Sequence, residues 1–431
     1  MNKIIYISCF LMYFSTLSTA QNDLNEAWEL LNSQSYNEAV QYLEKFILQS
    51  PENPEAHYFL GQAYYKLHCP DGSYIDSTDI NLALNASMHF NSSVQICPEY
   101  SGRIFIMDPY SKLTAIWGTM AMSYICMGKP DSALWAFKFG QSEGGFRPAL
   151  LEYNRNVLAT CEEGAILFTN GDNDTFPMWF LQMVEGYRKD VTIINTSLLN
   201  ISWYIRQIKS SYPFGSNNAI FNLSEAEIDS LTPIHWQDTE FELPEKGITT
   251  RNRKMIWIVK PTIENIGRRT QDQVMLEILK ANIENRPIYF SSTLSKENRL
   301  GLDYYLRCDG LAYCLSFDKS EKFPEVLSNN IFKVYSFKEL EDESTKYSKD
   351  IISLIQNYRY SLAILSWFWY ENEDKDKAKE ILEKMFEMFP EESFSYVNPE
   401  VKKSFNDYYN CLLYTSSPAH HLLMYQLLPV E

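Results

Sequence analysis

The sequence predicts an α + α/β fold, in which helical repeats lie on both sides of a small α/β domain with a parallel sheet. Three observations support this prediction. Helical segments with small and large apolar residues at regular spacing occur before residue 160 and after residue 335. Between them, short apolar runs alternate with helical segments. With 45% hydrophobic and 15% aromatic residues, a chain of 431 residues has enough apolar side chains for packed cores.

The first twenty residues are expected to be a secretory signal peptide. Lys3 precedes an apolar run from Ile4 to Leu17, and Ser18-Thr19-Ala20 supplies the small residues of a cleavage site. The run is too short to span a bilayer comfortably, and no later run is long and apolar enough, so no membrane span is expected after cleavage. The sequence therefore predicts a periplasmic or secreted protein.

The charge and the cysteines exclude several classes of site. A net charge of −17 argues against a broad basic surface, so no nucleic-acid partner is expected. None of the cysteines that follow residue 20 has the spacing of a zinc site, and no glycine-rich phosphate loop is present. We expect no cofactor, and whether the chain binds a metal stays open.

Four segments have the spacing of paired helices, in which small residues allow close approach and large ones fill the groove. The best first helices read His57-x2-Leu60-Gly61-x2-Tyr64, Trp117-x2-Met120-Ala121-x2-Tyr124 and Leu362-x2-Leu365-Ser366-x2-Trp369. The second helices are marked by Ala39, Ala86, Ala133 and Ala378, and three of them end before a proline. This spacing is that of tetratricopeptide repeats. The loop around Cys69-Pro70-Asp71-Gly72 is expected to be an insertion.

The middle of the chain changes to alternating strands and helices. Strands are expected over Ala165–Thr169, Val191–Asn195 and Pro287–Ser291, and helices over 176–187, 199–209 and 271–283, with Pro177 in the first turn of its helix. This order predicts a small Rossmann-like parallel sheet with crossover helices. Residues Met255–Val259 are expected to add an edge strand.

Four parts of the chain follow from these patterns. They are a signal peptide over 1–20, tetratricopeptide-like helical repeats over 21–160, the α/β domain over 161–335, and a C-terminal helical region with one further repeat over 336–431.

Short polar side chains follow all three expected strands. Ligands tend to bind where the carboxyl ends of parallel strands meet, so this edge is the candidate site. The candidate ligand-binding residues are Asn170, Asp172, Asn173, Asp174, Asn195, Ser291 and Thr293. Their oxygens suit Ca²⁺, Mg²⁺ or the hydroxyls of a sugar. The same residue types also form turns and cap helices, so a purely structural role stays open. We assign no catalytic residue.

The run Ala165–Pro177 (AILFTNGDNDTFP) closely resembles the soluble, extracytoplasmic portion of protein O-mannosyltransferase-like membrane proteins, a domain of unknown function. Supporting matches are Val184–Val191, Leu198–Ile205, Arg286–Phe290 and Asp309–Tyr313. Many such proteins also carry tetratricopeptide repeats. The resemblance implies the fold and the compartment. It does not imply transferase activity, because members that transfer sugar do so through a multi-spanning membrane part without a counterpart here.

The sequence therefore predicts an exported, non-catalytic tetratricopeptide-repeat protein that acts as a scaffold or binding module for a protein or glycan partner in the cell envelope. Two alternatives stay open. One is a carbohydrate-active enzyme, or an accessory to protein O-glycosylation, that uses the turn with Asp172 and Asp174. The other is a structural module stabilised by a bound cation.

Overall fold

The chain divides into two compact units, Met1–Gly145 and Phe146–Glu431, in a computed structural model. The described residues are 24–69, 78–210, 221–244, 254–264, 266–320, 323–341 and 343–414. The predicted signal peptide lies outside these ranges, as do residues 70–72 of the predicted insertion.

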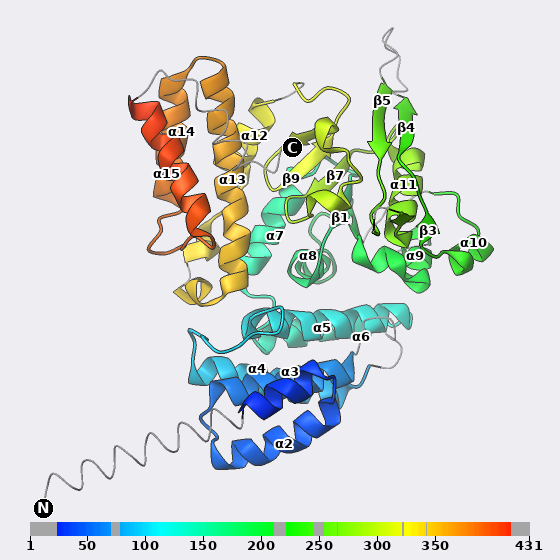
Figure 1. The fold of residues 1–431 in the computed structure, drawn as a ribbon, viewed down its shortest axis with the longest axis vertical. Coiled ribbons are helices and arrows are strands. Elements are labelled where there is room, and N and C mark those ends of the chain that lie inside the picture. The colour runs from blue at the N-terminus through cyan, green and yellow to red at the C-terminus, as the bar shows by residue number, and fades with distance from the viewer. Residues whose placement is uncertain are drawn as a thin grey trace, which may run out of the picture. The chain divides into compact units, whose positions relative to one another are not determined.

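The first unit is helical throughout its described secondary structure (Figure 1). Its labelled helices are α2 (Tyr36–Gln49), α3 (Pro54–His68), α4 (Ile80–Ile96), α5 (Pro109–Cys126) and α6 (Pro130–Ser142). Each helix packs on the next one along the chain. Close packing depends on small residues: a Cβ atom placed on Gly61 of α3 would lie 3.1 Å from the ring of Phe90 on α4. Glycine at this position thus lets the two helices approach.

Local sequence signals explain where α3 and α5 begin. Both start with a proline. Proline has no N–H, but this costs no hydrogen bond in the first turn of a helix, where the N–H groups have no acceptor within the helix. In front of each proline stands a capping side chain. Asn53 accepts a hydrogen bond from the N–H of Ala56 at 3.0 Å, and Asp108 accepts one from the N–H of Ser111 at 2.8 Å.

The second unit is built around a five-stranded sheet with the order β2-β1-β7-β9-β8. The strands are β1 (Ile166–Thr169), β2 (Thr192–Asn195), β7 (Ile288–Ser291), β8 (Leu306–Cys308) and β9 (Ala312–Leu315). Strand β1 runs parallel to β2 and β7, as predicted, but β9 is antiparallel to both β7 and β8. The sheet is therefore mixed, and the prediction of a parallel sheet is wrong for β9, which runs opposite to the other four strands.

The short connection between β8 and β9 explains the mixed sheet. A tight turn joins only antiparallel strands, because parallel neighbours need a long crossover. Gly310 occupies this turn with φ +133°, a value that side chains other than glycine rarely adopt. A Cβ atom at Gly310 would also lie 1.9 Å from the hydroxyl of Tyr335.

Helices cover the sheet and extend the unit toward its C-terminal end (Figure 1). The helices near the sheet are α7 (Pro148–Thr160), α8 (Asp172–Val184), α9 (Ser202–Lys209), α10 (Glu225–Ser230), α11 (Thr270–Asn282) and α12 (Glu325–Asn329). The chain then forms α13 (Lys349–Glu371), α14 (Lys375–Met388) and α15 (Pro399–Tyr414), of which α14 packs against both others. The division between the units precedes α7, so α7 is part of the second unit, although the predicted boundary follows residue 160.

Two small antiparallel pairs accompany the main sheet. Strand β4 (Thr239–Pro244) pairs with β5 (Lys254–Val259), and β3 (Ile234–His235) pairs with β6 (Gly267–Arg268). The segment expected as an edge strand is thus a strand of a separate ribbon. Exposed and buried residues alternate along β5, the pattern of a strand with one solvated face, whereas every residue of β1 is buried.

Among the helices within the described ranges, none combines the length and the apolar character needed to cross a bilayer.

Candidate functional site

The predicted site residues lie at the carboxyl ends of three parallel strands. Asn170 follows β1, and Asp172, Asn173 and Asp174 form the first turn of α8. Asn195 ends β2, Ser291 ends β7, and Thr293 follows two residues later. The structure places most of them in two hydrogen-bonded sets that meet at the adjacent residues Asp174 and Thr175. We name the two sets together the strand-end cluster: Asn170, Asp174, Thr175, Asn195, Ser291 and Thr293. Asp172 and Asn173 lie half-buried beside it.

Asp174 is the centre of the strand-end cluster. Its side chain is 2% exposed. Oδ2 accepts hydrogen bonds from the N–H of Asn170 at 2.9 Å and from Oγ1 of Thr293 at 2.7 Å. Oδ1 accepts one from Oγ of Ser291 at 3.0 Å. The carboxylate thus ties the end of β1 to the end of β7.

Asn195 belongs to the second set of the strand-end cluster, which joins the end of β2 to α8. Its Nδ2 donates to Oγ1 of Thr175 at 2.9 Å, and its Oδ1 accepts from the N–H groups of Ser197 and Leu198 at 2.9 and 3.2 Å. The amide therefore caps the 3₁₀ turn η2 (Ser197–Asn200) that follows β2. The turn-and-cap chemistry that the sequence leaves open is present at this residue.

Helix α8 begins earlier than predicted, at Asp172, and this places Pro177 inside the helix instead of in its first turn. Proline has no N–H, so the carbonyl four residues earlier, on Asn173, loses its helical donor. The side chain of Asn154 on α7 replaces that donor, with Nδ2 at 2.9 Å from the Asn173 carbonyl oxygen. A polar residue on a neighbouring helix thus accommodates the proline.

Burial sets the protonation chemistry of the cluster. It raises the pKa of Asp174 to about 6, and the hydrogen bonds from Asn170, Thr293 and Ser291 offset part of that shift. No cation pairs with the carboxylate among the described residues, so its three neutral donors stabilise the charge. In the described ranges, no group of three or more His, Cys, Asp or Glu residues could hold a metal ion.

A second polar site lies elsewhere in the same unit, at a pocket of about 860 Å³. The end of β5, the following turn, β6 and the segment after residue 295 form its walls. The residues that line it are Ile258, Lys260, Pro261, Thr262, Glu264, Arg268, Arg269, Lys296, Glu297, Leu300, Gly301 and Asp303. None of the predicted site residues is among them. We name this feature the Arg268 pocket.

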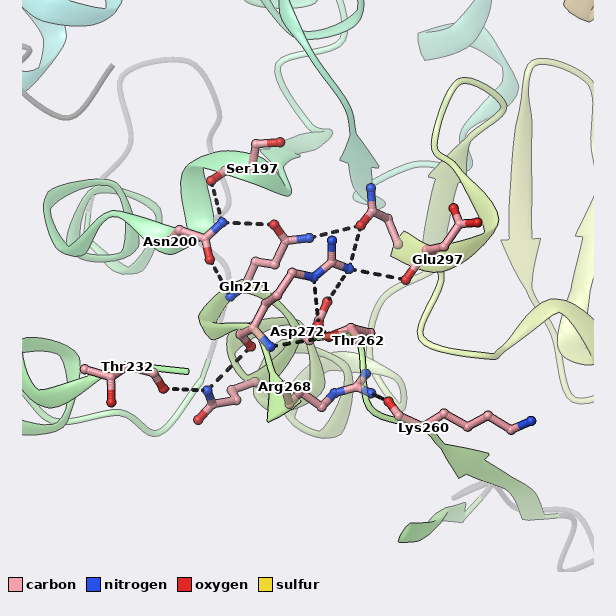
Figure 2. A network of polar contacts seen from close by, with 12 residues as sticks. Ser197, Asn200, Thr232, Lys260, Thr262, Arg268, Gln271, Asp272 and Glu297 are labelled. Atoms are coloured by element: carbon pink, nitrogen blue, oxygen red, sulfur yellow. Dashed lines mark hydrogen bonds and ion pairs between the residues drawn. The ribbon is translucent and has the colours of Figure 1, made fainter. Parts of the chain in front are cut away.

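A polar network beside the pocket fixes the start of α11 (Figure 2). Asp272 is fully buried, and its Oδ2 accepts from Oγ1 of Thr262 at 2.6 Å and from Nε of Arg269 at 3.1 Å. Nη2 of Arg269 donates to Oδ1 of Asp272 at 3.2 Å and to Oδ1 of Asn298 at 2.8 Å. The charge of Arg269 is therefore balanced by Asp272.

Arg268 lies next to this network and is only 1% exposed. Its Nη1 donates to the carbonyl of Lys260, and its guanidinium lies 5.4 Å from the ring centre of Trp236. Nε and Nη2 are buried and have no hydrogen-bond partner. Burial lowers the pKa of Arg268, and the charge of Asp272 opposes that shift. The guanidinium thus keeps unused donors beside a cavity.

The sequence contains little that could reveal this pocket. Its only signal is the pair Arg268-Arg269 directly in front of the helix α11. Which of the two arginines would meet Asp272 depends on the placement of α11, and the sequence does not specify it.

One family model matches part of this unit: TMEM260-associated domain 2, over residues 151–230 and 245–331. The matched ranges contain the three parallel strands, the strand-end cluster and the Arg268 pocket, and they do not extend into the first unit. None of the curated proteins matches the chain. The second unit is thus similar to TMEM260-associated domain 2.

Proposed function

We propose that this chain is an exported, non-catalytic binding protein of the cell envelope. In this proposal, tetratricopeptide-like helix pairs and an α/β domain of the O-mannosyltransferase-like soluble type act together as a scaffold or binding module. The partner is a protein or a glycan.

One observation carries the non-catalytic part of the proposal. Asp174, the buried acid at the predicted edge, accepts hydrogen bonds from Asn170, Ser291 and Thr293. A general acid or a nucleophile needs an oxygen that can reach substrate. The contacts of Asp174 instead hold two strands and a helix together, which supports a structural role for the turn.

The close helix packing supports the scaffold part. Small residues at the predicted positions are fully buried, as Ala39, Ala86, Ala133 and Ala378 each have 0% exposure. Together with the close approach at Gly61, these residues follow the pattern by which paired helices stack into extended binding surfaces.

The experiment compares wild type with Asp172→Asn, expressed with residues 1–20 in a Gram-negative host. We expect processed protein in the periplasmic or culture fraction, cross-linking of both proteins to the same envelope partner, and no turnover of glycoside substrates by either. Hydrolysis by wild type that Asp172→Asn abolishes would overturn the proposal and support a carbohydrate-active enzyme. Retention of both proteins in the cytoplasmic fraction would overturn export.

A further inference from the structure

We propose that the Arg268 pocket binds a small organic acid, whose carboxylate pairs with the Arg268 guanidinium and whose hydroxyl groups contact the pocket walls. The inference goes beyond the function proposed above and does not depend on it. It starts from one buried cation and the cavity beside it.

Each of the other deeply buried arginines of the described residues has a carboxylate partner or several acceptors. Arg307 pairs with Asp309 through two hydrogen bonds of 2.6 and 2.8 Å. Arg359 donates to three acceptors at 2.6 to 2.7 Å, namely Oε1 of Gln356 and the carbonyls of Phe389 and Phe394, and of its three nitrogens only Nε has no partner. Arg299 contacts a carbonyl at 3.0 Å and Asp303 at 3.4 Å. All three are 4% exposed or less.

Arg268 differs from these three in having a single acceptor. The carbonyl of Lys260 takes one N–H, while Nε and Nη2 have none. Asp272, the buried acid whose charge acts on Arg268, is already bonded to Arg269 and Thr262. An uncompensated buried charge is strongly unfavourable, and an unsatisfied buried donor requires an explanation. A bound anion would supply both the missing charge and the missing acceptors.

The pocket walls select the kind of anion. Lys260 and Lys296 add positive charge, whereas the exposed residues Glu264 and Glu297 add negative charge. This mixture disfavours a multiply charged phosphate and suits a single carboxylate whose neighbouring hydroxyls donate to the acidic side chains. The volume of about 860 Å³ lies in the range of small-molecule sites.

A change in the side-chain conformation of Arg268 would bring its guanidinium to such a ligand. It is held by one carbonyl and one aromatic ring, in contrast to the three acceptors around Arg359. A rotamer change that exchanges the Lys260 carbonyl for the ligand carboxylate keeps Nη1 bonded and gives Nη2 its first acceptor. The carboxylate therefore binds bidentately, as arginine geometry favours.

Isothermal titration calorimetry of the full chain tests the proposal. The probes are acetate, the smallest simple carboxylate, and glucuronate, a carboxylate with hydroxyls, with glucose as the neutral match and sulfate as an inorganic anion. We expect binding of glucuronate, weaker binding of acetate, and none of glucose. Failure of both carboxylates to bind, or sulfate binding as tightly as glucuronate, would overturn the organic-acid assignment.

Arg268→Met removes the cation and keeps much of the side-chain volume. We expect glucuronate affinity to fall about 10- to 100-fold, the effect of losing charged hydrogen bonds. The melting temperature should stay the same or rise, because the variant removes an unpaired buried charge. Arg206→Met, on the exposed face of α9, is the control and should bind as wild type does. Unchanged affinity in Arg268→Met would overturn the proposal.

Discussion

The strand-end cluster and the Arg268 pocket are both buried polar groups at the start of a helix, but they differ in how fully their members are bonded. Around Asp174, each carboxylate oxygen has a donor, and the donors lie at the ends of two strands, β1 and β7, or directly after them. Around Arg268, the neighbouring acid is bonded to another arginine, and two guanidinium nitrogens, Nε and Nη2, have no acceptor. A convergence of polar residues is therefore a structural feature when its members satisfy one another. It becomes a candidate binding site when one of them does not.

Arg268 and Arg359, the two buried arginines without a carboxylate partner among the described residues, offer the largest test of this comparison. Arg359→Met leaves three acceptors without a donor, so we expect it to lower the free energy of unfolding by about 3 kcal/mol. Arg268→Met should change it by less than about 1 kcal/mol or raise it. Urea unfolding of both variants measures the difference. Equal destabilisation by the two substitutions would mean that Arg268 is as fully used by the fold as Arg359.

Substitution of Asp174 tests the other side of the comparison. Asp174→Ala leaves the hydroxyls of Ser291 and Thr293 and the N–H of Asn170 without an acceptor, so we expect a loss of about 2 kcal/mol of stability. The matched control is Asp376→Ala, an exposed aspartate in the first turn of α14. It should cost only about 0.5 kcal/mol through the helix dipole. If Asp376→Ala lowered the free energy of unfolding as much as Asp174→Ala, the hydrogen bonds of Asp174 would not explain the loss. The cluster would then have no special structural role.

The raised pKa of Asp174 predicts a pH dependence of stability. Its folded pKa of about 6 lies above the ordinary value of 3.8, so between these values the folded state binds more protons than the unfolded state. The contribution of Asp174 to stability is therefore highest below pH 4 and declines as the pH rises through 6, by roughly 3 kcal/mol.

Asp174→Asn has no proton to lose at this position and serves as the reference for that measurement. The difference in unfolding free energy between wild type and Asp174→Asn should shift against wild type as the pH is raised from 4 to 7. A constant difference over this range would contradict the raised pKa and show that the three donors fully offset the burial of the charge.

Much of the strand-end cluster could be predicted from the sequence because short-range patterns determine it. Apolar runs that end in Asn170, Asn195 and Ser291 identify parallel strands, and the carboxyl ends of such strands meet by geometry alone. The start of α8 was harder to predict, because Pro177 in the helix interior is tolerated only with the help of Asn154 on α7. That contact depends on tertiary packing.

The antiparallel strands and the Arg268 pocket depend on longer-range features. Strands β8 and β9 are short, and the close approach of Gly310 to Tyr335 that fixes their turn joins segments distant in the chain. The pocket needs β5, β6 and the segment after residue 295 to come together, although β5 belongs to a separate ribbon. Neither arrangement has a local pattern of residues that specifies it.

Lys296 provides the smallest and most selective test of the comparison. It lines the pocket and is only half-buried, so solvent and salt screen its charge. Lys296→Met should weaken glucuronate binding about two- to threefold at low ionic strength, and the effect should vanish at high salt. Calorimetry at two salt concentrations measures this. A loss as large as that for Arg268→Met, and independent of salt, would shift the main anion contact from the buried arginine to the rim. In that case the unpaired donors of Arg268 would no longer explain where in the pocket the anion binds.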